Sequence, residues 1–180
     1  RRLLAEGIRM IVADVPAADL LALADAPEAR GALIFNTRAR DDALRNRDCR
    51  ANVLHVMPSR AMLADALAQY LAWKRWRNWL LVVGRHPGDK AFAAALKRAA
   101  GRFGAKIVAE KEWTFDAGAR RTDSGHVNAQ QEVPAFTQGP DHDVLVVADE
   151  ADEFGELLTY RTVLPRPVAG THGLGATPWH

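Results

Sequence analysis

Buried-strand patterns and helical patterns alternate through the middle of the chain. A short, largely apolar run occupies positions 52–57, an uninterrupted apolar run occupies 80–83, and apolar residues at helical spacing follow each of these runs. Uninterrupted apolar runs are typical of strands that are covered on both faces. Ser59 stands where an N-cap is expected for the first helix, Asp89 stands at the same place in the second, and Gly104 can close that second helix.

The same alternation continues on both sides of this central unit. Further strands are expected at 8–13, 32–35, 107–115, 143–148 and 167–169, and further helices at 1–6, 17–26, 126–138 and 152–158. One helical turn is expected near 41–44, and a loop at 116–125. Strands that alternate with helices need crossover connections, and right-handed crossovers give a mostly parallel sheet with helices on both faces. The sequence therefore predicts an α/β fold.

Polar residues follow the expected strands at their carboxyl ends, which is where open parallel sheets bind ligands. Position alone marks seven candidate ligand-binding residues: Asp14, Asn36, Thr37, Arg85, His86, Asp149 and Glu150. We expect Asn36 and Thr37 to face Arg85, His86, Asp149 and Glu150 across a solvent-filled gap. Asp149 and Glu150 could form an acid–base pair or half of a metal site, but adjacent acids before a helix are more often solvated caps that the helix dipole favours.

The familiar short motifs of enzyme active sites are absent from this sequence. There is no dinucleotide-binding fingerprint, phosphate loop, nucleophile elbow or zinc-protease motif. The turn at 84–88 is the nearest match to a phosphate loop, but Pro87 removes a backbone donor, so a tight strand-to-helix turn is favoured. Trp73, Trp76 and Trp79 could form a stacking platform, although packing on the sheet edge is favoured. No catalytic residue and no cofactor is predicted.

Composition narrows the choice of partners. The 180 residues are 48% hydrophobic, enough for a core, and a net charge of +2 with dispersed basic residues does not indicate a nucleic-acid partner. The single Cys49 excludes an internal disulfide, and the six histidines never lie three or four residues apart, so no metal site is predicted. No apolar run approaches the roughly 20 residues that cross a bilayer.

Several segments carry a resemblance to a known family. The segments NVLHVMPSR at 52–60 and WLLVVGRHPGDKAF at 79–92, with the helices that follow them, resemble the substrate-binding proteins of ABC transporters with the type I periplasmic-binding fold. This class includes the leucine/isoleucine/valine-binding proteins. Four further segments resemble the branch associated with pyrroloquinoline quinone (PQQ)-dependent alcohol oxidation: DSGH at 123–126, QQEVPAFTQG at 130–139, HDVLVVADE at 142–150 and RPVAGT at 166–171.

The resemblance implies a two-lobed binder without catalytic activity, which closes on a small-molecule solute in a cleft between its lobes and delivers it to a membrane permease. It also implies a periplasmic location, no cofactor, and contact with the membrane only through the permease. On this mapping, residues 1–56 belong to a partial first lobe, 57–170 to the second lobe, and 171–180 approach the hinge strand. The chain starts at Arg1 and lacks the family's opening and closing segments, so an internal fragment is expected.

The resemblance leaves the identity of the solute open. The family's ligand-binding positions in the first lobe fall on 15–16 and 36–37 of this chain. Pro16 and Arg38 depart from the small hydroxyl residues that amino-acid-binding members use there. The resemblance therefore does not predict that this chain binds amino acids.

Two other functions stay open at this point. A sensor domain with the same periplasmic fold could use the same cleft to control a signalling partner. A doubly wound α/β enzyme, which is less favoured, could use Asp14, Asp149 and Glu150 at the carboxyl edge of its sheet.

Overall fold

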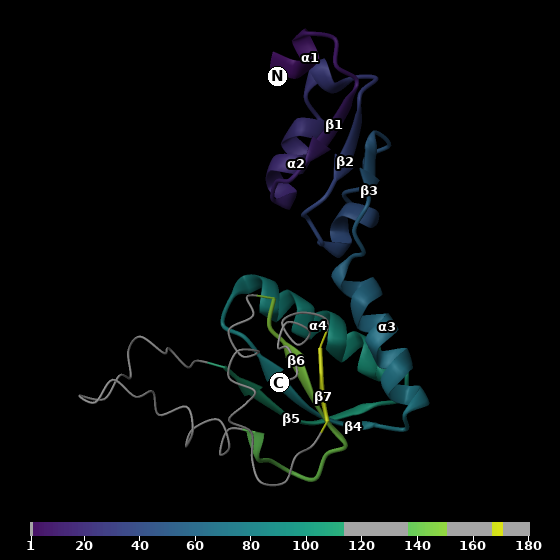
Figure 1. The fold of residues 1–180 in the computed structure, drawn as a ribbon, viewed down its shortest axis with the longest axis vertical. Coiled ribbons are helices and arrows are strands. Elements are labelled where there is room, and N and C mark those ends of the chain that lie inside the picture. The colour runs from purple at the N-terminus through teal and green to yellow at the C-terminus, as the bar shows by residue number, and fades with distance from the viewer. Residues whose placement is uncertain (1, 114–136, 151–166, 171–180) are drawn as a thin grey trace, which may run out of the picture. The chain divides into compact units, whose positions relative to one another are not determined.

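The computed structural model describes residues 2–113, 137–150 and 167–170. The chain divides into two compact units, Arg1–Met62 and Leu63–His180. Each unit has its own parallel sheet and its own hydrophobic core (Figure 1). The predicted α/β fold is confirmed.

The first unit contains a three-stranded parallel sheet in the order β1-β2-β3. Its elements are α1 (Arg2–Ala5), β1 (Met10–Ala13), α2 (Ala17–Ala24), the 3-10 helix η1 (Pro27–Ala29), β2 (Leu33–Asn36), the 3-10 helix η2 (Asp42–Arg45) and β3 (Val53–His55). The register pairs Ala13 with Asn36 and Asn36 with His55. The carboxyl ends of the three strands therefore meet at one edge of the sheet.

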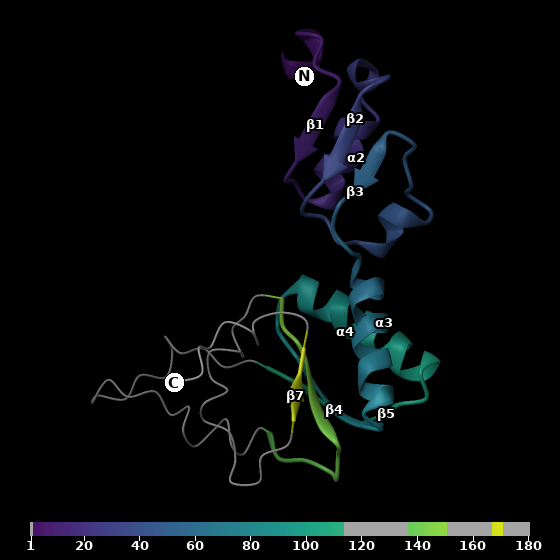
Figure 2. The same cartoon turned by 45° about the vertical axis from the view of Figure 1, so that its right-hand side comes forward.

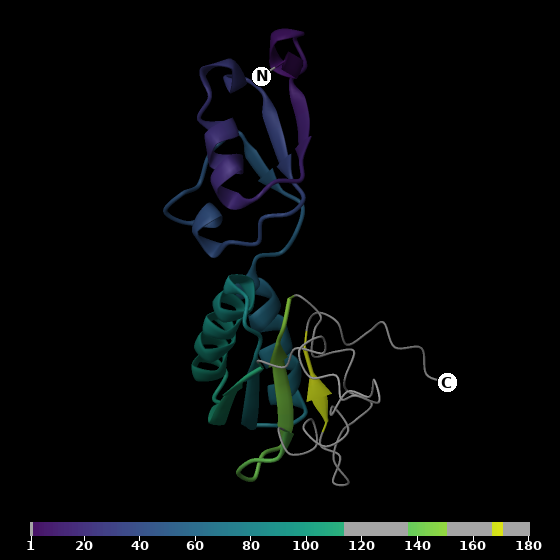
Figure 3. The same cartoon turned by 90° about the vertical axis from the view of Figure 1, so that its left-hand side faces the viewer.

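Helix α2 covers one face of this sheet (Figure 3). Leu20 of α2 and Ile34 of β2 are fully buried in the core between them. The other face carries Met10 and Val12, whose side chains are 71% and 73% exposed. Within the described residues, the first sheet is thus packed on one face and presents apolar side chains to solvent on the other.

The second unit contains a four-stranded parallel sheet in the order β5-β4-β6-β7. Its elements are α3 (Arg60–Trp73), which begins in the first unit, β4 (Asn78–Val83), α4 (Pro87–Arg102), β5 (Lys106–Glu112), β6 (Val144–Ala148) and β7 (Val168–Ala169). Strand β4 lies between β5 and β6 and is buried from Trp79 to Val83. This confirms the prediction, from the apolar run alone, that the strand is covered on both faces.

Helices α3 and α4 lie side by side (Figure 2) and share one core with the sheet. Trp79 and Leu81 of β4 pack in this core with Phe92 and Leu96 of α4. The predicted apolar face of α4 is therefore confirmed. Gly104 follows the helix with a φ of +70°, the left-handed conformation expected of a closing glycine.

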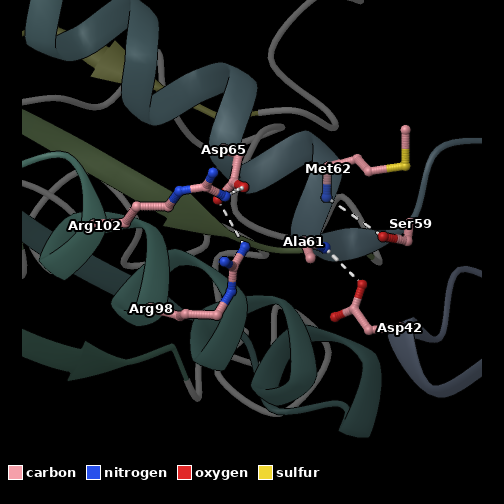
Figure 4. A network of polar contacts seen from close by, with 7 residues as sticks. All are labelled: Asp42, Ser59, Ala61, Met62, Asp65, Arg98 and Arg102. Carbon is pink, nitrogen blue, oxygen red and sulfur yellow. Dashed lines mark hydrogen bonds and ion pairs between the residues drawn. The ribbon is translucent and has the colours of Figure 1, made fainter. Parts of the chain in front are cut away.

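The N-terminus of α3 is capped by two oxygen atoms (Figure 4). The hydroxyl oxygen of Ser59 accepts the backbone N–H of Met62 at 3.4 Å, which confirms Ser59 as the N-cap. A carboxylate oxygen of Asp42 accepts the N–H of Ala61 at 2.9 Å. These bonds satisfy backbone donors that have no partner inside the helix.

One carboxylate on α3 binds two guanidinium groups of α4 (Figure 4). Asp65 accepts from Arg98 at 2.7 Å and from Arg102 at 2.6 Å. The Asp65 side chain is 18% exposed, whereas those of Arg98 and Arg102 are 46% and 62% exposed. The two ion pairs link α3 to α4 at the surface, above the core that both helices share with the sheet.

Three local predictions are corrected by the structure. His86 is the N-cap of α4, so Asp89 is the third residue of the helix rather than its cap. Asn36 is the last residue of β2 rather than part of the loop that follows it. The sheet-packing prediction holds for Trp79, which is buried, and is wrong for Trp73, which is 74% exposed at the end of α3.

The remaining elements agree with the sequence where the structure describes them. The expected strands at 8–13, 32–35, 107–115, 143–148 and 167–169 correspond to β1, β2, β5, β6 and β7, and the turn near 41–44 to η2. The expected helices at 126–138 and 152–158 and the loop at 116–125 lie wholly or mostly outside the described residues.

Candidate functional site

The loops after β1 and β2 form the polar edge of the first unit. The backbone N–H and the hydroxyl of Thr37 both donate to the Ala13 carbonyl, at 3.1 and 3.2 Å. Both hydrogen-bond donors of Thr37 are therefore engaged, and its hydroxyl oxygen retains lone pairs to accept a bond. Arg38 Nε lies 3.8 Å from Asp14 Oδ1, and the two side chains are 60% and 75% exposed.

Asn36 organises this edge from inside the protein. Its side chain is fully buried. The Oδ1 atom accepts the backbone N–H groups of Arg38 and Ala39 at 3.1 and 2.9 Å, and Nδ2 lies 2.7 Å from the Ala39 carbonyl and 2.9 Å from Nδ1 of His55. These four contacts hold the loop after β2 against the end of β3. A contact between Asn36 and a solute stays a prediction, and it would require one of these bonds to break.

His55 lies at the end of β3, where its ring meets Asn36. Burial lowers the pKa of His55, and the positive charge of Arg45 lowers it further, while a hydrogen bond with the backbone of Leu44 acts in the opposite direction. Arg45 in turn donates to the carbonyl of Met57. The net effect favours the neutral imidazole.

The corresponding edge of the second unit is organised by Asp89. This carboxylate is fully buried in the first turn of α4. It accepts the backbone N–H of His86 at 3.0 Å through Oδ2 and the N–H of Glu150 at 2.6 Å through Oδ1. The loop after β4 and the end of β6 are thereby joined through one side chain.

Gly84 leaves room for this carboxylate. Its N–H donates to the Ala148 carbonyl at 2.9 Å, which continues the pairing of β4 with β6. A Cβ atom at position 84 would lie 2.3 Å from Oδ2 and 2.6 Å from Cγ of Asp89. Only a glycine fits at this position without displacing the buried carboxylate.

The structure places the seven candidate residues at two sheet edges. The first edge holds Asp14, Asn36 and Thr37, and the second holds Arg85, His86, Asp149 and Glu150. The side chains differ in access to solvent, since Arg85 and His86 are exposed and Asp149 is 3% exposed. For all seven residues, contact with a solute stays a prediction.

Sequence reasoning missed the roles of Asp89 and His55. The spacing of three residues between His86 and Asp89 is that of a capping box, in which the third helical residue reaches back to the N-cap backbone, and this signal could have placed Asp89 correctly. His55 is a polar residue within an apolar run, which signals a buried hydrogen bond. Neither signal shows which distant residue the side chain contacts, which is Glu150 for Asp89 and Asn36 for His55.

Metal and membrane sites receive no support from the described part of the chain. Among residues 2–113, 137–150 and 167–170, no group of three or more His, Cys, Asp or Glu side chains could hold a metal ion. No helix in those same segments is both long enough and apolar enough to span a bilayer.

The comparison with protein families decides the identity of the fold. A family model described as periplasmic binding protein matches residues 1–123. The chain belongs to the periplasmic binding protein family. This is a family of binding proteins, which agrees with the expectation that the chain is not an enzyme. No curated protein sequence matches the chain.

Solved structures show the same fold at low sequence identity. An ABC transporter substrate-binding protein from Desulfitobacterium hafniense in complex with Leu is 16% identical, with a TM-score of 0.67 over 96% of this chain and 50% of its own. A branched-chain amino acid ABC transporter periplasmic ligand-binding protein from Burkholderia xenovorans is 18% identical, with a TM-score of 0.63 over 92% and 43%. An ABC transporter solute-binding protein from R. palustris in complex with benzoate is 12% identical, with a TM-score of 0.60 over 96% and 46%. The chain therefore spans half or less of the length of these proteins.

Proposed function

We propose that the chain is part of the solute-binding component of an ABC transporter. The observation that carries this proposal is the family match over residues 1–123. The polar loops at the carboxyl ends of the strands in each unit support it, because open parallel sheets bind ligands at that edge. The permease partner, the periplasmic location and the lobe boundary at Met57, with 171–180 approaching a hinge strand, belong to the same proposal.

We propose a small carboxylate as the class of solute. The solved structures named above include one in complex with Leu and one in complex with benzoate, and these two solutes share a carboxylate group. In this chain, Arg38 presents a half-exposed guanidinium group at the edge of the first sheet, and its ion pair with Asp14 is a long contact of 3.8 Å. A guanidinium can bind a carboxylate through two parallel hydrogen bonds.

We also propose a link to PQQ-dependent alcohol catabolism. This finer assignment is supported by the resemblance of four segments in the second half of the chain, between 123 and 171. Oxidation of a primary alcohol leads through the aldehyde to a carboxylic acid, so a carboxylate solute is chemically compatible with that link.

Thermal shift and titration calorimetry of the 180-residue chain test the proposal, with benzoate and L-leucine as probes. A ligand that binds the folded state raises the melting temperature without being consumed. We expect Arg38→Gln to abolish the shift caused by benzoate. The matched control is Arg30→Gln, which changes an exposed arginine at the end of η1 and should leave the shift unchanged. Conversion of either probe would show an enzyme, and equal shifts in the two variants would place the solute elsewhere.

A further inference from the structure

The side-chain amide of Asn36 has one possible orientation. Its Oδ1 atom receives two backbone N–H groups, those of Arg38 and Ala39. Its Nδ2 atom faces the carbonyl of Ala39. If the amide were turned over, donors would face donors and the two carbonyl oxygens would face each other, so all three bonds would be lost.

This orientation fixes the protonation state of the neighbouring ring. Nδ2 of Asn36 is a donor and lies 2.9 Å from Nδ1 of His55, so that ring nitrogen must carry a lone pair. The backbone of Leu44 also acts on the ring and raises its pKa, but burial and Arg45 outweigh it, so the imidazole is favoured in its neutral form. A neutral imidazole with a lone pair on Nδ1 carries its hydrogen on Nε2, so the orientation of Asn36 assigns this tautomer to His55.

We propose that neutral His55 is a positioning residue for the loop at 37–39, and that protonation of its Nδ1 releases this loop. A proton on Nδ1 would point at the amide hydrogens of Asn36. The amide cannot turn over without losing three bonds, so the ring must move away and the side-chain contact between Asn36 and His55 breaks. Asn36 then loses one of its four contacts, the one that ties it to β3, and its hold on the loop at 37–39 weakens.

The charges around the ring favour the neutral state. Arg45 of η2 is the described charged group that acts directly on the imidazole, and it opposes protonation. The two acids at the start of η2, the element that carries Arg45, have other partners. Asp41 pairs with Arg60 at 3.5 Å, and Asp42 accepts the N–H of Ala61. The remaining neighbour on the adjacent strand is the amide of Asn36, which carries no charge.

The loop at 37–39 contains Thr37 and Arg38, so its release has a consequence for binding. That consequence rests on the proposed function, in which Arg38 meets a carboxylate solute. At low pH, Asn36 would hold the backbone of Arg38 less firmly. The guanidinium group would then be positioned less well, and the solute would bind more weakly. The release of the loop itself does not depend on any solute.

The ring state can be measured directly by NMR of the ligand-free 180-residue chain. Two-bond and three-bond ¹H–¹⁵N correlations report which ring nitrogen carries the hydrogen. We expect the Nε2–H tautomer of His55 at pH 7.5. The opposite tautomer, with its hydrogen on Nδ1, would overturn the proposal without any variant having to fold.

Amide hydrogen exchange at Arg38 and Ala39 then tests the release of the loop. After correction for the intrinsic rate, we expect protection at these two amides to fall as the pH drops from 7.5 to 5. His55→Asn places a carbonyl oxygen near the position of Nδ1 and cannot be protonated, so its protection should not change with pH. The control His142→Asn changes a buried histidine of the second unit and should behave like the wild type at these two amides.

The outcomes separate this proposal from the proposed function. A pH response that persists in His55→Asn overturns the positioning role, whether or not benzoate binds. A loop that responds through His55 in a chain that binds neither benzoate nor L-leucine supports the positioning role and counts against the proposed function.

Discussion

The carboxylate of Asp89 accepts the backbone N–H of Glu150 at 2.6 Å, which joins the first turn of α4 to the end of β6 across 61 positions of sequence. The same carboxylate accepts the N–H of His86 at the start of the helix. A fully buried charge is costly unless hydrogen bonds satisfy it, and here two backbone donors do so. Asp89 therefore fixes the relative position of the two loops that carry four of the candidate residues.

Replacing Asp89 by alanine should destabilise the second unit strongly. The change leaves the N–H groups of His86 and Glu150 without this acceptor, and we expect a loss of about 2–3 kcal/mol in the free energy of unfolding. Urea denaturation followed by circular dichroism measures it. Glu112→Ala is a control, because it removes an exposed ion pair with Lys90 and should cost less than about 1 kcal/mol. Similar losses in the two variants would contradict the role given to Asp89.

Gly84 and Gly101 should respond to alanine with opposite signs. At position 84 the new Cβ would meet the Asp89 carboxylate at 2.3 Å, so Gly84→Ala should cost about 1–3 kcal/mol by forcing buried atoms apart. At position 101, in the last turn of α4, no atom lies within 4 Å of a built Cβ. Gly101→Ala should stabilise the protein by about 0.5–1 kcal/mol, because alanine loses less backbone freedom in a helix.

The melting temperatures of the two variants check this prediction. A Gly84→Ala protein as stable as the wild type would show that the carboxylate of Asp89 can move at little cost. In that case the bond between Asp89 and Glu150 would not position the loops.

His55 should make the stability of the chain depend on pH. Its pKa is lowered in the folded state from an ordinary value of 6.5, so the unfolded chain binds the proton more readily. The contribution of His55 to stability is fully present above pH 6.5 and is lost as pH falls through 6.5 toward the folded pKa. Urea midpoints between pH 8 and 5 should therefore fall more steeply for the wild type than for His55→Asn. If the urea midpoints of the two proteins fell equally with pH, His55 would not be the source of the pH dependence.

The exposed face of the first sheet should promote self-association. Met10 lies beside Leu33 in the register, and Val12 lies beside Phe35, so apolar side chains of neighbouring strands gather on one face. Contiguous exposed apolar surface favours aggregation. We expect Val12→Lys to lower the light scattering of the 180-residue chain at high concentration. Met62→Lys replaces a residue of α3 that is 53% exposed and should have little effect, whereas equal effects would mean that added charge alone keeps the chain soluble.

The positions of helices and strands could largely be predicted from the sequence because their signals are local. The cap at Ser59, the apolar face of α4 and the closing Gly104 each depend on residues within about one turn of helix, and the structure confirms all three. The apolar run at 80–83 fixed β4 as a buried strand for the same reason. Alternation of such elements was enough to predict an α/β fold.

Tertiary structure alone decided what the polar residues do. Asn36 and His55 are 19 positions apart, and Asp89 and Glu150 are 61 apart, so no local pattern could show that each pair is hydrogen-bonded. The rule that marks strand ends as ligand sites gives a place in the fold, whereas burial and hydrogen bonding depend on which distant segments pack there. For the same reason Trp73, which local composition suggested would pack on the sheet, is exposed, while the charged side chain of Asp89 is fully buried.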